Sequence, residues 1–155
     1  MIHAELSHGA EIAGLRASGY APLCAANQCS TLGRDMHILI VDDDTNVRQT
    51  LIHTVKYTGY DALGCANGVE ALDYLHSPAE CPCLMFLDVE MPVMGGWAVL
   101  QKIQDDSELA TIPVVMISAG GDHTQLALAH GAVSFLKKPF DITMVMTIIK
   151  HYCES

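Results

Sequence analysis

Acidic side chains directly follow two short apolar runs of this sequence. Asp42 and Asp43 come after residues 38–41, and Asp88 comes after residues 84–87. A carboxylate that ends a buried strand contributes little to packing, but it is well placed for chemistry on the adjoining loop. These three carboxylates are therefore the first candidates for a functional site.

Two more polar side chains come after later apolar runs. Ser118 comes after residues 113–117, and Lys138 comes shortly after residues 133–136. Three carboxylates at one place repel each other unless a cation lies among them, and Mg²⁺ suits such a site because it prefers oxygen ligands and keeps several waters. A carboxylate could then accept a phosphoryl group, while the metal and Lys138 neutralise its oxygens and Ser118 donates a hydrogen bond.

Strand-like and helix-like segments alternate from Met36 onward. The predicted strands are 38–41, 60–66, 84–87, 113–117 and 133–136, and the predicted helices are about 46–57, 67–76, 97–104, 124–130 and 141–152. Strands that are almost continuously apolar are typical of a parallel sheet covered on both faces. We therefore predict a flavodoxin-like, doubly wound α/β fold with strand order 2-1-3-4-5, which places the ends of strands one and three side by side.

Composition and charge restrict the possible partners. The formal net charge of −10 argues against nucleic-acid binding, and no apolar run approaches the roughly 18 to 20 residues of a membrane span. The first ten residues lack the basic end and apolar stretch of a signal peptide. We expect a cytoplasmic protein without nucleic acid or membrane as a partner, whose six scattered cysteines are thiols in a reducing compartment.

Residues 1–35 differ from the rest of the chain. Glycines and a proline interrupt any helical period there, and the strong pattern begins abruptly at Met36. We predict that residues 1–35 are a flexible leader or a non-native extension, with a short packed helix as the alternative. Residues 36–155 are predicted to form one domain.

Residues 36–153 resemble a response-regulator receiver domain, the family of the chemotaxis and sporulation phosphorelay regulators. The matching motifs are Ile38-Leu39-Ile40-Val41-Asp42-Asp43-Asp44, Leu87-Asp88-x-x-Met91-Pro92-x-Met94-x-Gly96, Ile117-Ser118-Ala119 and Lys138-Pro139-Phe140. Their order and spacing extend over the whole predicted domain.

The resemblance implies roles for the acidic residues. Asp88 would be the phosphoacceptor. Asp43 and Asp88 would ligate Mg²⁺ together with the backbone carbonyl of Val89, and Asp42 would act largely through a water.

The resemblance also implies a switch. Lys138 and Ser118 would contact the phosphoryl oxygens, and Phe135 takes the place of the family's aromatic switch residue. Two positions depart from the family pattern in ways that bear on the loop and the lifetime of the phosphoryl group. Gly95 replaces an aspartate, which should loosen the loop, and Glu90 lies where the family modulates phosphoryl lifetime.

The implied function is that of a single-domain response regulator in a two-component system or phosphorelay. It would accept a phosphoryl group from the phosphohistidine of a histidine kinase or histidine phosphotransfer protein, and it would be a signalling switch with autocatalytic phosphoryl transfer and autodephosphorylation, not an enzyme. The output surface would combine the fourth predicted helix, the fifth strand and the fifth helix. The many apolar residues of that last helix, from Met144 to Ile149, suggest a downstream protein or a homodimer.

Two alternatives stay open. Asp42 and Asp44 have the Asp-x-Asp spacing of haloacid-dehalogenase-type phosphatases, in which Asp42 would be the nucleophile. Against this, Asn46 stands where that family has threonine, and Asp88 would have no role. The second alternative is a receiver-like scaffold that works without phosphorylation.

Overall fold

The core of the protein is a parallel sheet. The computed structural model describes residues 36–77 and 81–154, so the prediction for residues 1–35 lies outside the described residues. Within those ranges the sheet has five strands in the order β2-β1-β3-β4-β5, which confirms the predicted fold and strand order. The strands are β1 (His37–Val41), β2 (Asp61–Cys65), β3 (Leu84–Asp88), β4 (Val114–Ser118) and β5 (Ser134–Lys137).

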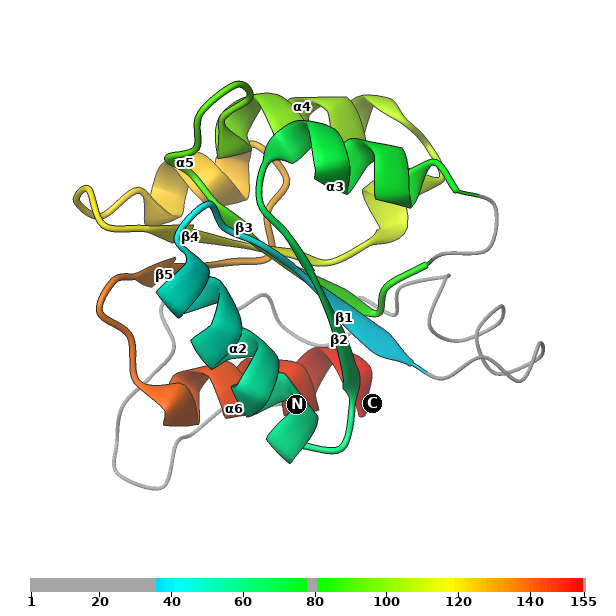
Figure 1. Cartoon of the computed structure of the whole chain (residues 1–155). Coiled ribbons are helices and arrows are strands. Elements are labelled where there is room, and N and C mark those ends of the chain that lie inside the picture. Colours follow the sequence, from blue (N-terminus) through cyan, green and yellow to red (C-terminus); the bar gives the residue numbers. More distant parts are fainter. Residues whose placement is uncertain (1–35, 78–80, 155) are drawn as a thin grey trace.

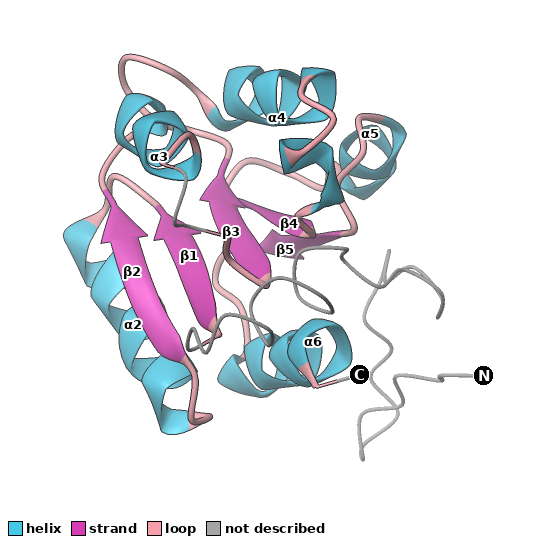
Figure 2. Ribbon diagram, turned by 90° about the vertical axis from the view of Figure 1, so that its right-hand side faces the viewer, coloured by secondary structure: helices cyan, strands magenta, loops and turns pink. Residues whose placement is uncertain are grey.

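Helices cover both faces of this sheet (Figures 1 and 2). The helices α2 (Thr45–Tyr57) and α6 (Ile142–Cys153) pack on one face, and α3 (Gly68–Leu75), α4 (Gly96–Asp105) and α5 (Thr124–Ala129) pack on the other. A short 3₁₀ helix, η1 (Leu109–Thr111), was not predicted. In the part of the chain that the structure describes, no helix has the length and apolar character needed to cross a bilayer.

The central strands are apolar throughout because successive side chains enter different cores. In β1, Leu39 and Val41 join the core beneath α3, α4 and α5, whereas Ile38 and Ile40 join the core beneath α2 and α6. All four side chains are fully buried. A strand whose two faces are both covered has no polar side, which explains why its sequence does not alternate.

Local capping fixes where three helices begin. The Asp44 side chain accepts hydrogen bonds from two amides of α2, and the predicted cap Asp141 accepts one from Thr143 in α6. The Asn67 side chain caps α3 by accepting a hydrogen bond from the Glu70 amide. The Glu70 carboxylate in turn accepts a hydrogen bond from the Ala66 amide, just before the helix. The caps of α2 and α6 end the loops that leave β1 and β5 at one edge of the sheet.

Helix α6 has less exposed apolar surface than its sequence suggests. Val145, Ile148 and Ile149 are buried in the core, and the partly buried Met144 packs against the same core. Most of the apolar residues of α6 therefore serve the fold. The large apolar side chain that α6 exposes is Ile142, at its first residue, with 48% of its surface accessible.

The cysteines do not all have the same state. Cys65, Cys83 and Cys153 are free and buried, as expected of thiols. Cys81 is disulfide-bonded, so the expectation that all cysteines are thiols was wrong for this residue.

Candidate functional site

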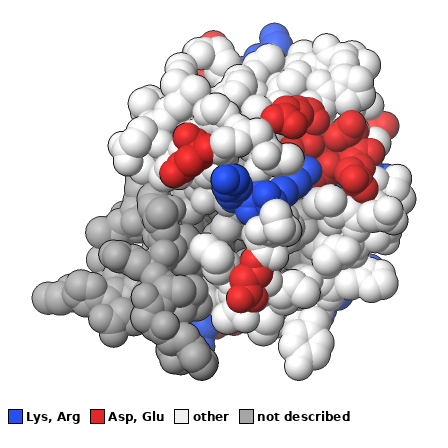
Figure 3. Space-filling model, turned by 90° about the vertical axis from the view of Figure 1, so that its left-hand side faces the viewer, with Lys and Arg blue, Asp and Glu red and all other residues white. Residues whose placement is uncertain are grey.

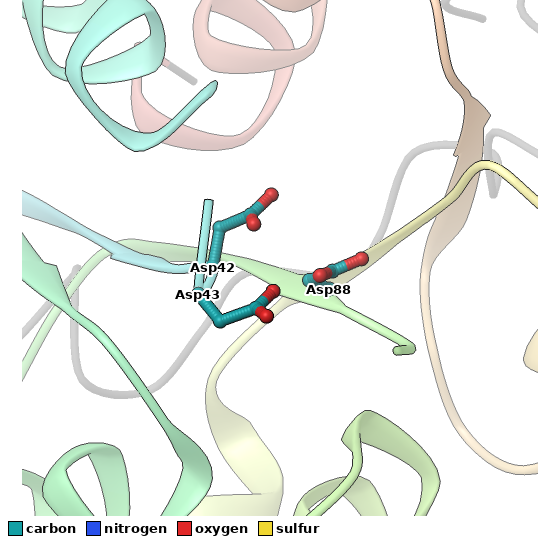
Figure 4. Close-up of side chains that lie close together, drawn as sticks. All are labelled: Asp42, Asp43 and Asp88. Carbon is teal, nitrogen blue, oxygen red and sulfur yellow. The ribbon is translucent and has the colours of Figure 1, made fainter. Parts of the chain in front are cut away.

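Three carboxylates meet where β1 and β3 end. One carboxylate oxygen from each of Asp42, Asp43 and Asp88 lies within 4.8 Å of the others. Figure 4 shows the three side chains grouped at this edge of the sheet. The strands are direct neighbours, and Val41 pairs with Leu87, so the residues at their carboxyl ends necessarily lie side by side. Asp42 and Asp88 are 1% and 2% exposed, whereas Asp43 is exposed.

Lys138 joins this acid cluster from the end of β5. Its Nζ lies 2.9 Å from Asp42 Oδ2 and 3.3 Å from Asp88 Oδ1. Its backbone amide donates to the carbonyl of Ser118 at 2.8 Å, which holds the loop after β5 against the end of β4. In the space-filling view, acidic side chains gather beside a basic group on this face (Figure 3).

The electrostatics of the site favour a proton or a cation at Asp88. Burial, followed by the charge of Asp42, raises the pKa of Asp88 to about 7, although Lys138 acts in the opposite direction. Burial also opposes the charge of Lys138. The hydrogen bond and charge of Asp42, together with Asp88, outweigh that cost and hold the pKa of Lys138 above its usual value.

The donor set of the acid cluster fits a divalent cation. Three carboxylates and one ammonium leave a formal charge of −2 when all are ionised, and every carboxylate donor is a hard oxygen. The Val89 carbonyl, predicted to ligate the metal together with Asp43 and Asp88, accepts a hydrogen bond from the Gly96 amide at 2.9 Å. A carbonyl oxygen has two lone pairs, so one remains, and its role as a ligand stays a prediction.

The Ser118 hydroxyl is at the same edge but is engaged by Glu90. Ser118 Oγ donates to Glu90 Oε1 at 3.3 Å and accepts from the Gly120 amide at 3.0 Å. A Cβ atom on Gly120 would lie 2.6 Å from Glu90 Oε1, so this glycine makes room for the carboxylate. Sequence reasoning identified Ser118 and Glu90 separately but missed their contact; the glycine pair after Ala119 was the available signal.

The predicted switch residue Phe135 lies on β5, paired with Met116 of β4. Its side chain is only 5% exposed. The His123 ring packs edge-to-face against Phe135, with ring centroids 6.1 Å apart, and edge-to-face against Trp97 at 6.3 Å. Sequence reasoning did not single out His123 or Trp97, because a lone histidine in a loop carries no pattern.

The loop after Asp88 folds back on the strand that it leaves. A Cβ on Gly96 would collide with the Asp88 carbonyl oxygen, so only glycine allows this return. Gly95 is the N-cap of α4 without a side-chain cap hydrogen bond. Val93 has φ +70° and is 87% exposed, a strained conformation for a β-branched residue. The loosening expected from Gly95 stays a prediction.

Asp44 does not join the acid cluster. Its Oδ1 accepts hydrogen bonds from the amides of Asn46 and Val47 at 2.8 and 3.3 Å. A haloacid-dehalogenase mechanism needs this second aspartate beside the first, so its use as a helix cap argues against that alternative.

Comparison with known proteins agrees with this geometry. A model of the response regulator receiver domain family matches residues 38–150. The chemotaxis protein CheY1 of Helicobacter pylori is 34% identical over 108 residues, which are 68% of this chain and 86% of that protein. Probable transcriptional regulators named ycf27, from Guillardia theta and Galdieria sulphuraria, are 35% and 38% identical over 66% and 70% of this chain. The matches span only 39% and 42% of those two proteins.

Solved structures extend the similarity to three dimensions. The chemotaxis response regulator CheY4 of Vibrio cholerae has a TM-score of 0.67 at 29% identity, covering 75% of this chain and 98% of that one. The receiver domain of a signal transduction histidine kinase from Syntrophus aciditrophicus has a TM-score of 0.70 at 30% identity, covering 77% and 90%. An acidic triad such as Asp42, Asp43 and Asp88 is typical of the Mg²⁺ site of receivers.

Proposed function

The chain belongs to the response regulator receiver domain family, and from this premise we propose that Asp88 accepts a phosphoryl group from a phosphohistidine. A receiver domain is a phosphorylation switch of two-component signalling rather than a classical enzyme, and its family implies a histidine kinase as partner. A histidine phosphotransfer protein is the second possible donor within the proposal. We also propose a cytoplasmic location, where such donors present their phosphohistidine.

One observation carries the assignment of Asp88. The Lys138 ammonium lies within 3.3 Å of both Asp42 and Asp88, and Asp43 completes the cluster. In the proposed transfer an Asp88 carboxylate oxygen attacks phosphorus while the bond from phosphorus to the imidazole nitrogen breaks. Lys138 neutralises negative charge on the oxygens of the phosphoryl group during the transfer.

Asp42, Asp43 and Asp88 would hold Mg²⁺, with Asp42 acting through a water. The cation supplies positive charge at the phosphoryl oxygens when it is bound. Within the protein, Asp42 keeps Lys138 in place: its Oδ2 binds the ammonium at 2.9 Å, and its Oδ1 accepts the Asp44 amide at 2.9 Å. Asp42 is thus a positioning residue as well as a source of charge.

The switch step is proposed for Ser118 and Phe135. Phosphorylation of Asp88 places acceptor oxygens opposite the Ser118 hydroxyl, which would then leave Glu90. Phe135 lies on the neighbouring strand, is buried and contacts His123, so its ring would rearrange among packed side chains. Such a change shifts a pre-existing equilibrium.

The output surface is proposed to combine α5, β5 and α6. Leu126 on α5 and Ile142 on α6 are large apolar side chains with 45% and 48% exposure. Exposed apolar side chains on these two helices offer contacts for a downstream protein or for a second copy of the chain. Passing the phosphoryl group onward is the alternative output.

The test is phosphorylation of the Asp88→Asn variant with acetyl phosphate and Mg²⁺. We expect the wild-type protein to gain one phosphoryl group, seen by intact-mass spectrometry, and Asp88→Asn to gain none. Asp44→Asn is the matched control, because asparagine caps helices as well as aspartate does and Asp44 lies outside the acid cluster.

The same variants distinguish the alternatives. Labelling of Asp88→Asn at the wild-type rate would disprove the proposal. Hydrolysis of a phosphate ester that is lost in Asp42→Asn and Asp44→Asn but kept in Asp88→Asn would instead indicate the phosphatase. A folded wild-type protein that takes up no phosphoryl group from any donor would favour the scaffold.

A further inference from the structure

Two buried cysteines meet at the edge of the sheet opposite the acid cluster. Cys83 immediately precedes β3, and Cys153 is the last residue of α6. Their sulfur atoms lie 2.6 Å apart, although the residues are 70 positions apart in the sequence. Cys83 is 1% exposed and Cys153 is 8% exposed. The proposed phosphorylation site lies five residues along β3, about 16 Å away.

The backbone holds both cysteines in place. The Cys83 amide donates to the His37 carbonyl at 3.0 Å, which extends the pairing of β3 with β1. Cys153 belongs to the final turn of α6, next to the buried Tyr152, and both cysteines belong to the same core. The sulfur atoms are therefore brought together by the fold itself.

The surroundings of the pair disfavour thiolate. The hydrogen bond to Cys83, burial and the charge of Glu154 all raise the pKa of Cys153. Nearby Tyr60 has a pKa raised to about 12 by burial, with Cys153 and Glu154 contributing. Because the thiolate is the reactive form, we expect oxidation of this pair to be slow near neutral pH.

We propose that Cys83 and Cys153 are a modification site, at which a peroxide converts the two thiols to an intramolecular disulfide. The more exposed Cys153 attacks one peroxide oxygen, the O–O bond breaks, and a sulfenic acid and one water form. The Cys83 sulfur then displaces the hydroxyl group as the second water. Two thiols lose two electrons and two protons, and one hydrogen peroxide becomes two waters.

This disulfide joins the C-terminal end of α6 to the start of β3. It closes a loop of 70 positions, which restricts the unfolded chain and stabilises the folded one. Burial also shields the bond from reductants, so reversal is slow unless the protein opens locally. Since α6 contributes to the proposed output surface, oxidation would restrain that helix without touching the acid cluster.

The experiment exposes the full-length folded protein to hydrogen peroxide and maps the cysteines by mass spectrometry. Cleavage after Glu70 and Lys150 places Cys65, Cys83 and Cys153 on different peptides. We expect a peptide joining Cys83 to Cys153, formed about a hundredfold faster at pH 9 than at pH 7, because the reactive thiolate fraction rises about tenfold per pH unit below the pKa. We also expect a higher Tm for the oxidised protein, which returns to the starting value after full reduction with dithiothreitol.

Matched variants identify the bond. Cys83→Ser and Cys153→Ser should lose the linked peptide, whereas Cys65→Ser, which changes another buried free thiol, should keep it. Cys81→Ser should also keep it, which excludes a link through the neighbouring disulfide-bonded Cys81. The proposal is overturned if the folded wild-type protein yields separate sulfinic acids at Cys83 and Cys153. It is also overturned if both thiols remain unmodified after prolonged treatment at pH 9.

Discussion

At the scale of single residues, the proposed phosphorylation depends on a carboxylate that the fold makes costly to ionise. Asp88 is 2% exposed and lies close to Asp42. Among the described residues, Lys138 is the cation that forms an ion pair with Asp88. The result is a pKa of about 7 for a group that usually titrates near 3.8. A cation bound beside this group would remove the repulsion between the carboxylates that burial strengthens.

The first prediction concerns Asp88 and pH in the absence of divalent cations. Between about pH 4 and 7 the folded state keeps a proton that the unfolded state has lost, so raising the pH lowers the free energy of unfolding. The Asp88→Asn variant lacks this titrating group, so its free energy of unfolding does not fall with pH for this reason. At pH 8 it should be more stable than wild type by about 2 to 4 kcal/mol. The difference should vanish near pH 4.

Urea denaturation in EDTA from pH 4 to 8 measures this effect. Asp43→Asn is the control, since that carboxylate is exposed and its neutralisation should stabilise the protein less. Mg²⁺ should raise the stability of wild type far more than that of Asp88→Asn. An Asp88→Asn variant that is less stable than wild type at pH 8 would contradict the assigned electrostatics.

The second prediction concerns the Glu90 carboxylate, which holds the Ser118 hydroxyl. Glu90→Gln removes a negative charge from the approach of an anionic donor and weakens the competition for Ser118. Phosphorylation by acetyl phosphate should become roughly threefold to tenfold faster, equivalent to about 1 kcal/mol in the barrier. Gly120→Ala should act in the same direction, because its Cβ would displace Glu90 Oε1.

Time-resolved mass spectrometry of the phosphorylated fraction measures the rate. Glu108→Gln is the matched control: it removes the same charge from an exposed residue beside η1 and should leave the rate unchanged. Equal rates for wild type, Glu90→Gln and Gly120→Ala would show that the Ser118 contact does not limit transfer.

At the scale of elements, the loop from β3 to α4 combines a tight return with a strained residue. Gly96 allows the backbone to pass the Asp88 carbonyl, and its amide bonds to Val89. Val93 adopts a left-handed conformation, and its side chain is almost fully exposed. The loop is thus held at its ends and strained at its centre.

The third prediction is that Val93→Gly stabilises the protein. Glycine relieves a strain of about 1 to 3 kcal/mol, and part of that gain is offset by the added freedom of the unfolded chain. A net gain of about 1 kcal/mol in the free energy of unfolding is expected, measured by urea denaturation. The free energy of unfolding of Val93→Ala should lie between those of wild type and Val93→Gly, because alanine removes the β-branch but keeps a Cβ. A loss of stability in Val93→Gly would show that the conformation costs nothing.

At the scale of the whole molecule, the described residues make a complete three-layer unit. Helices α2 and α6 cover one face of the sheet, and α3, α4 and α5 cover the other. The receiver family model matches residues 38–150. We therefore propose that residues 36–155 are the receiver domain.

The fourth prediction tests this division by expressing residues 36–155 alone. Because both cores are covered by the unit's own helices, the shortened chain should fold, with a cooperative thermal transition by circular dichroism. Its rate of labelling by acetyl phosphate should match that of the full chain. The full chain with Asp88→Asn is the negative control for labelling. A shortened chain that fails to fold would assign residues 1–35 to the domain.

The sheet, its strand order and the residues at its carboxyl edge could all be predicted from the amino-acid sequence. A parallel strand with both faces covered must be apolar throughout, so each strand is visible, and the residues after its last apolar position must lie at the carboxyl edge. Helix caps such as Asp141 are equally local. The observed boundaries of the predicted strands and helices differ from the predicted ones by at most one residue, and η1 was too short to show a period.

The contacts among those residues could not be predicted, because they depend on the three-dimensional fold. Lys138 binds Asp42 as well as Asp88, Glu90 holds Ser118, and Cys83 contacts Cys153. These pairs are separated by 28 or more positions, and their contacts depend on loop paths and side-chain rotamers. Periodicity and spacing place a residue at an edge, but they carry no information about which atom of a neighbouring loop it will touch.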